Sequence, residues 1–183
     1  QITTVEATGE VEFSHQDQVA RGETLTWQNL TQAGVLVGSP ARLSRPNVQI
    51  ATPELTFFKV DQRFRSEGAG ELTYQQPEEP PGRSPGAGSS DREPAAPVPL
   101  QPSGPIRVVW NDGMRFDARE REAVFSGQVE AEQGKDRLQC DQLELSFGEG
   151  EDAQGKLRVV TASGNVTGVQ NIAGQRRRLE CER

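Results

Sequence analysis

The carboxylates of Asp141 and Glu144 have the clearest potential for acid–base chemistry in this sequence. Carbohydrate-active β-solenoids use paired carboxylates on a long repetitive β-sheet as their catalytic residues. Here, however, the two residues fall on opposite sides of an expected strand, and Asp112 takes the place of Asp141 in another copy of the same short motif. A residue that recurs in register usually serves the structure, here as an acceptor at a turn or bulge. We therefore predict no catalytic residues, with a carbohydrate-active enzyme as an alternative.

Other reactive side chains are few. The single histidine, His15, lies in a predicted hairpin and leaves little scope for a catalytic triad or a histidine metal site. Cys140 and Cys181 lack metal-ligand spacing, and we expect a strand to run between them, which keeps them apart. The acidic loop Glu149–Asp152 lacks the alternating ligands of a calcium site. We predict neither a metal nor a cofactor.

Charge and composition narrow the class of protein. The net charge of −7 and the pI of about 4.9 argue against nucleic-acid binding, and the run Arg176–Arg178 is too short to reverse this. Only 33% of the residues are hydrophobic and 5% aromatic, which is low for one compact core. The chain has no apolar run long enough to span a membrane and no signal peptide. It begins at Gln1 and stops within a repeat, so we expect a fragment of a longer exported protein.

The segment from Gln75 to Pro105 interrupts the sequence pattern. It holds most of the 12 prolines and has almost nothing to bury, so we expect a disordered loop. It divides the chain into residues 1–74 and 106–183, which carry the same kind of β repeat. We predict that these two parts continue a single sheet.

A first motif recurs on both sides of this loop. It reads apolar-x-small-x-Gly-x-Val-x-apolar, with the period-two alternation of a strand. Its central positions are 9, 39, 70, 127 and 164. On each side of the loop the spacing is roughly 30–37 residues, which is typical of repeat architectures, and the central glycine is a natural site for a bend.

A second motif, small-polar-x-apolar-x-apolar, alternates with the first. Its copies begin at Gly22, Thr52, Asn111 and Cys140, and a fifth begins at Cys181. In two copies the apolar positions change parity, as between Ile50 and Leu55. Because a shift of one residue reverses the face of a strand, a repeated change of parity predicts a bulge or bend.

The connections between these strands are short and polar, for example Ser14–Asp17, Lys59–Arg63 and Glu132–Asp136. Hairpins can close over such lengths, whereas parallel crossovers need a dozen residues or more. We therefore predict an all-β, bent antiparallel meander built from repeated strand pairs, with an apolar inner face, open ends and almost no helix.

The repeats resemble a known family. Ala162–Val166, Phe125–Val129 and Ala7–Val11 are similar to the A-x-G-N-V core of the OstA-like family, and Leu138–Leu143 resembles its companion L-x-A-D-x-L strand. The resemblance extends over roughly 1–74 and 106–183, and the Pro-rich insertion departs from it. It implies the bent β-jellyroll, or β-taco, of lipopolysaccharide-transport (Lpt, LptA/OstA-type) proteins in the periplasm of diderm bacteria.

The same resemblance implies a function and partners. The expected function is a non-enzymatic scaffold that binds and transports lipopolysaccharide or another acylated lipid, with other Lpt-type β-jellyrolls docking end to end on its edge strands. The alternative is a structural cell-envelope or surface β-repeat protein without a lipid ligand. The residues that we expect to line the lipid groove share similar positions in successive repeats; the same side chains could also simply fill a core. They are Trp27, Leu55, Phe57, Phe116, Leu143, Leu145 and Phe147.

Overall fold

The computed structural model describes residues 2–15, 17–75, 104–148, 157–172 and 175–181, which contain thirteen strands and no helix. The strands are β1 (Thr4–His15), β2 (Gln18–Gln28), β3 (Ala33–Arg45), β4 (Val48–Phe58), β5 (Arg63–Glu67), β6 (Gly70–Tyr74), β7 (Ile106–Trp110), β8 (Gly113–Asp117), β9 (Glu122–Gln133), β10 (Asp136–Phe147), β11 (Leu157–Ser163), β12 (Val166–Ile172) and β13 (Gln175–Cys181). The described part therefore has no helix that could span a membrane.

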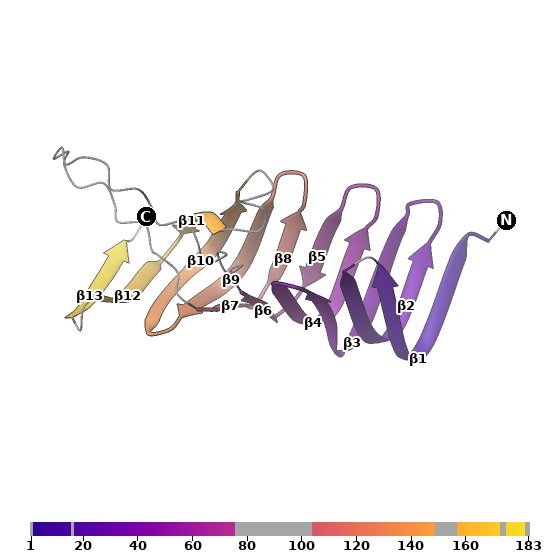
Figure 1. Cartoon of the computed structure of the whole chain (residues 1–183), viewed down its shortest axis with the longest axis horizontal. Helices are drawn as coiled ribbons and strands as arrows, with labels where there is room; N and C mark the ends of the chain where they lie inside the picture. Colours follow the sequence, from indigo (N-terminus) through magenta and orange to yellow (C-terminus); the bar gives the residue numbers. More distant parts are fainter. Residues whose placement is uncertain (1, 16, 76–103, 149–156, 173–174, 182–183) are drawn as a thin grey trace, which may run out of the picture.

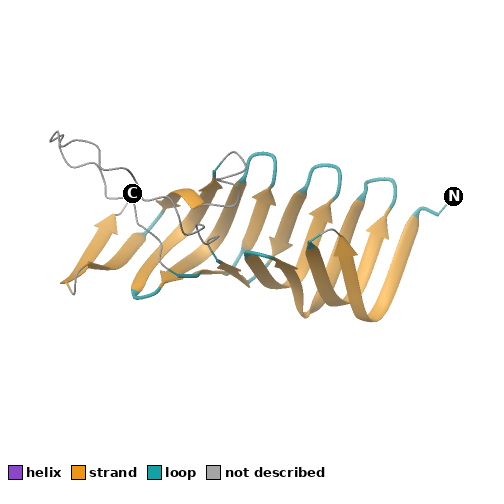
Figure 2. Ribbon diagram, viewed as in Figure 1, coloured by secondary structure: helices purple, strands orange, loops and turns teal. Residues whose placement is uncertain are grey.

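All the strands belong to one antiparallel sheet that follows the chain order (Figure 1). The pairs β5/β6, β7/β8 and β11/β12 each form two halves of one bent strand, since β5 pairs with β8 while β6 pairs with β7. Figure 2 shows the result, a long sheet folded lengthwise so that one row of half-strands faces another. The predicted bent antiparallel meander is confirmed.

The bends coincide with shifts in strand register. The pairing of β1 with β2 shifts between Thr8 and Val11, and that of β9 with β10 shifts between Cys140 and Gln142. The buried positions of β4 change parity as predicted, because Ile50 is buried on one side of the bend and Leu55 on the other. An unpaired residue at each bend thus keeps the apolar side chains of both halves on the inner face.

One bend lies elsewhere than the motif predicts. The predicted centre is Gly70, but the break between β5 and β6 comes two residues earlier, where Gly68 has a φ of +83°. Gly70 has another role: a Cβ there would lie 2.4 Å from Cζ2 of Trp110. The glycine therefore leaves space for the indole ring, which the repeat pattern alone does not distinguish from a bend.

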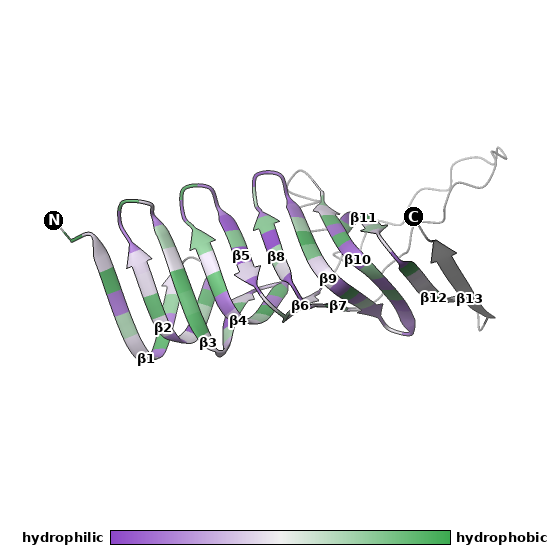
Figure 3. Ribbon diagram, turned by 180° about the vertical axis from the view of Figure 1, so that it is seen from behind, coloured by the Kyte–Doolittle hydropathy of each residue, from purple (hydrophilic) through white to green (hydrophobic). Residues whose placement is uncertain are grey.

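The two rows of half-strands enclose the apolar core. Figure 3 shows hydrophobic and hydrophilic bands alternating along the strands. Between β6 and β10, Trp110, Phe125 and Leu143 are fully buried, and the rings of Trp110 and Phe125 lie 5.2 Å apart.

Strand pairing connects the parts on either side of the Pro-rich segment. Tyr74, at the end of β6, pairs directly with Ile106, at the start of β7. A short hairpin turn can therefore close this gap. Arg107 on β7 adds two hydrogen bonds of 2.9 Å to the Glu71 carboxylate on β6.

We predict that residues 75–105 can be removed without loss of the fold. Replacing them with a four-residue turn that contains glycine should leave a single thermal transition close to that of the parent chain. Calorimetry of both chains measures this. Two separate transitions in the shortened chain would show that residues 1–74 and 106–183 unfold as independent domains.

We also predict that Cys140 forms no disulfide with Cys181. β12 pairs with β10 on one side and with β13 on the other, so two strand spacings, about 9.5 Å, separate the two positions. This exceeds the ~7 Å Cα limit for a disulfide. In addition, burial and then the Asp141 charge raise the pKa of the Cys140 thiol to about 11, which suppresses the reactive thiolate at pH 8.

Thiol labelling tests both statements. After mild oxidation of the folded protein, two thiols should react under denaturing, non-reducing conditions, and Cys140 should react slowly before denaturation. An intramolecular bond formed without unfolding would contradict the strand order.

Candidate lipid-binding groove

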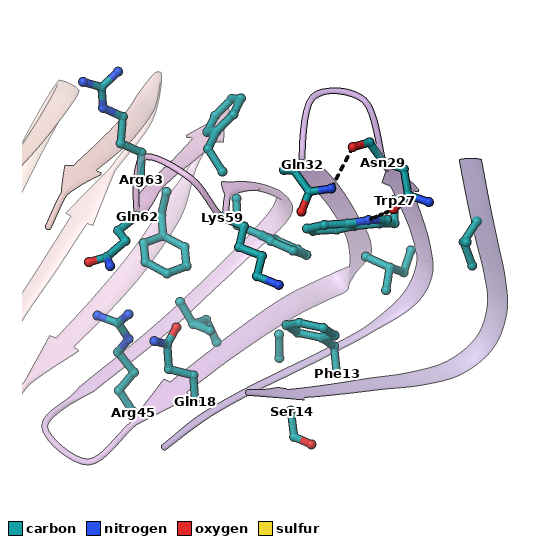
Figure 4. Close-up of a pocket in the computed structure, with 17 residues that line it drawn as sticks. Phe13, Ser14, Gln18, Trp27, Asn29, Gln32, Arg45, Lys59, Gln62 and Arg63 are labelled. Atoms are coloured by element: carbon teal, nitrogen blue, oxygen red, sulfur yellow. Dashed lines mark hydrogen bonds between the residues drawn. The ribbon is translucent and has the colours of Figure 1, made fainter. Parts of the chain in front are cut away.

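A cavity of about 750 Å³ opens between the two rows of half-strands in the region of β1 to β5. This size falls within the usual range for small-molecule sites. The close-up in Figure 4 shows an apolar interior with polar side chains toward the turns. The lining residues are Val5, Phe13, Ser14, Gln18, Ala20, Leu25, Trp27, Asn29, Gln32, Leu43, Arg45, Phe57, Phe58, Lys59, Gln62, Arg63 and Phe64.

Three aromatic rings form the centre of the cavity wall. Phe57 stacks on Phe13 with ring centroids 5.5 Å apart, and its centroid lies 5.8 Å from that of Trp27. Both Phe57 and Trp27 lie over Gly34 of β3, where an added Cβ would come within 2.4 Å of the Phe57 ring. The small residue thus sets how closely these rings approach the sheet.

The outer end of this wall is polar. The indole Nε1 of Trp27 donates a 3.0 Å hydrogen bond to Oδ1 of Asn29, and Nδ2 of Asn29 donates to the carbonyl oxygen of Ile2 at 2.9 Å. Trp27 therefore presents its apolar face to the cavity while its N–H group is satisfied at the rim. Such an arrangement suits a boundary between an apolar ligand and water.

Arg45 and a cluster of rings close the inner end of the cavity. The guanidinium of Arg45 lies 4.9 Å from the Phe64 ring centroid and 5.9 Å from that of Phe116. Phe147 contacts Phe116 edge-on, and the space between Arg45 and these rings is about 40 Å³, while a separate hollow of about 300 Å³ lies beside Phe64 and Phe116. The large cavity therefore lies in the region of β1 to β5, and the space that adjoins it beyond Arg45 is much smaller.

The residues expected to line a groove divide into three sets. Trp27 and Phe57 line the large cavity, and Phe116 and Phe147 line the small space beyond Arg45. The remaining three are buried in the core, namely Leu55, Leu143 and Leu145. That all seven contact lipid stays a prediction.

Sequence reasoning missed several cavity residues. Phe13 could have been found, because it ends the alternating row of the first motif on the same face as Val5 and Val11. Arg45 and Lys59 lie at strand ends, where no period marks the direction of a side chain, so only the three-dimensional arrangement reveals them.

Asp141, one of the two carboxylates considered for catalysis, and its counterpart Asp112 lie at two bends of the sheet. Asp112 lies against Gly127, and Asp141 lies against Gly164, so that a Cβ on either glycine would fall within 2.4 Å of the aspartate. Asp141 also accepts a 2.9 Å hydrogen bond from Nδ2 of Asn165. Within the described ranges, no group of three acidic, histidine or cysteine side chains could hold a metal ion. Residues 149–152 lie outside the described residues.

Comparison with known proteins supports the resemblance seen in the repeats. Residues 110–182 match the family model described as LptA/(LptD N-terminal domain) LPS transport protein. The match covers less than half of the chain and supports its resemblance to the OstA-like family. The description names a transport protein, which bears out the OstA-like and non-enzymatic predictions. Comparison with curated proteins gives no match.

A solved structure extends the OstA-like fold to most of the chain. The crystal structure of LptH, the LptA-homologous periplasmic component of the lipopolysaccharide-transport device of Pseudomonas aeruginosa, matches with a TM-score of 0.54 and 9% identity. The match covers 81% of this chain and 83% of LptH. It confirms the predicted β-jellyroll fold.

Proposed function

We propose that this chain is a periplasmic scaffold that binds lipopolysaccharide or a related acylated lipid and serves its transport. The observation that carries the proposal is the open apolar cavity between β1 and β5, with Phe13, Trp27 and Phe57 at its centre. An acyl chain that enters it gains about 0.8 kcal/mol per buried CH₂ group, so binding needs no elaborate polar site. The OstA-like match of residues 110–182 and the likeness to LptH support the same function.

The two ends of the sheet suit docking of further β-jellyrolls. Among the described strands, β1 pairs only with β2 and β13 only with β12, so each has one side without a described partner. Ile2 and Val5, near the β1 end, are exposed apolar side chains. We propose that a protein of the same fold adds its terminal strand to one of these edges through main-chain hydrogen bonds.

Photocrosslinking tests the lipid-binding function. A photoreactive amino acid in place of Trp27, inside the cavity, should form adducts with purified lipopolysaccharide. The matched control replaces Val37, which is 39% exposed on the neighbouring strand β3 and does not line the cavity. Adducts from position 27 and none from position 37 are expected. Equal labelling at both positions, or none at either, would favour a surface repeat protein without a lipid ligand.

A further inference from the structure

The cavity wall is positively charged although the chain as a whole is acidic. Its lining contains three cationic side chains, Arg45, Lys59 and Arg63, and no aspartate or glutamate. The net charge of the chain is −7, so this local balance is opposite to that of the molecule. A cavity that served only for acyl chains would gain nothing from cationic residues, since hydrocarbon offers them no partner.

Two of the three cations have no carboxylate partner in the described part of the chain. Arg63 is neutralised, because its Nε lies 2.7 Å from Oδ2 of Asp117. By contrast, neither Arg45 nor Lys59 forms an ion pair with a described carboxylate. These two side chains therefore remain available for an anion.

Arg45 is an unusual cation because it is partly withdrawn from water. Its Nε is buried without a hydrogen-bond partner, and the guanidinium lies over the rings of Phe64 and Phe116. Burial also lowers the pKa of Arg45, and the charge of Asp17 acts in the opposite direction. A buried donor without a partner is costly, and an anion that accepts its hydrogen bond removes this cost.

The two side chains come from opposite rims of the cavity. Arg45 ends β3 beside the turn into β4, whereas Lys59 follows β4 on the turn toward β5. In Figure 4 Lys59 reaches into the cavity from one turn, and Arg45 points into it from the opposite side. A headgroup held between the two would leave its acyl chain to extend over Phe13, Trp27 and Phe57.

We propose that Arg45 and Lys59 form an anion-binding clamp that holds the phosphate headgroup of an acylated lipid while the chain fills the cavity. This inference rests on the proposed lipid-binding function. A phosphate monoester suits the site because the guanidinium offers a fork of donors and the ammonium a compact charge.

Calorimetric titration with two amphiphiles of equal chain length tests the clamp. Dodecyl phosphate should bind the full chain about tenfold more tightly than dodecyl maltoside, since it adds charge-assisted hydrogen bonds to the same apolar burial. Arg45→Met and Lys59→Met should each reduce this preference, and the double variant should abolish it while dodecyl maltoside binds as before. Arg45→Lys should retain part of the preference.

Arg42→Met is the matched control, because Arg42 is an exposed residue on the same strand that does not line the cavity. It should keep the tenfold preference. A preference that survives in the double variant overturns the clamp, as does equal binding of both amphiphiles by the parent chain. If neither amphiphile binds the parent chain, the proposed lipid-binding function itself fails.

Discussion

Replacing Trp110 with alanine is expected to lower the free energy of unfolding by about 3–5 kcal/mol. The side chain is fully buried, lies over Gly70 and packs 5.2 Å from the Phe125 ring centroid. Its removal would leave a large void where β6, β7 and β9 meet, since close-packed neighbours relax only partially. Urea unfolding followed by circular dichroism measures the loss.

Trp27→Ala provides the matched control within the same chain. Trp27 is only partly buried and already borders an open cavity, so its removal creates little new void. We expect a loss of about 1 kcal/mol together with weaker binding of acylated lipid. Equal destabilisation by the two substitutions would contradict the division of the interior into a filled part and an open groove.

The size of the inner side chains along the described strands agrees with the place of the large cavity. From β6 to β10 the inner positions hold bulky side chains, such as Trp110, Met114 and Phe125. Near β2 and β3 the buried inner positions include Ala20, Ala41 and Gly34. Because both regions have the same bent-strand scaffold, side-chain volume decides where a ligand can enter.

The fold could be predicted from the sequence because two patterns specify it, the alternation of apolar residues and the repeat of the glycine-centred motif. Alternation of apolar residues predicts the strands, and the glycine-centred motif predicts bends at Gly9, Gly127 and Gly164, all of which have positive φ. Parity changes, as between Ile50 and Leu55, predict the register shifts.

The groove could be predicted only in part. Trp27 and Phe57 share a face that the period identifies, but Leu55 shares it too and is completely buried. Whether an inward side chain meets a neighbour or open space depends on residues from other strands, such as Gly34 beneath Phe57. The direction of Arg45, at the end of β3, similarly depends on rings from β5 and β8.

Gly127→Ala should destabilise the protein by about 2–5 kcal/mol through two separate effects. Gly127 has a φ of +82°, which costs an L-residue about 1–2 kcal/mol. An added Cβ would also lie 2.3 Å from Cγ of Asp112, so the aspartate or the bend must move. The position is constrained, because the Gly127 carbonyl accepts a 2.8 Å hydrogen bond from the Asn111 amide.

Further variants separate the backbone effect from the steric effect. Gly134→Ala should lower the free energy of unfolding through the backbone effect alone, because Gly134 has a φ of +59° with nothing within 4 Å of an added Cβ. We expect a loss of about 1–2 kcal/mol. Asp112→Ala removes the Cγ and Oδ2 contacts of 2.3 and 2.5 Å and keeps the Cβ contact of 2.7 Å, so it relieves part of the steric cost and leaves the backbone cost. The double variant Asp112→Ala with Gly127→Ala should therefore lose about 1–3 kcal/mol less than the sum of the single variants. If Gly127→Ala costs no more than Gly134→Ala, or if the double-mutant cycle shows additivity, the contact between Asp112 and Gly127 does not hold the bend in place. If the double variant loses less stability than the sum of the single variants, the Asp112 carboxylate occupies the space that Gly127 leaves free on the neighbouring strand. Asp141 and Gly164 repeat this arrangement at the next bend.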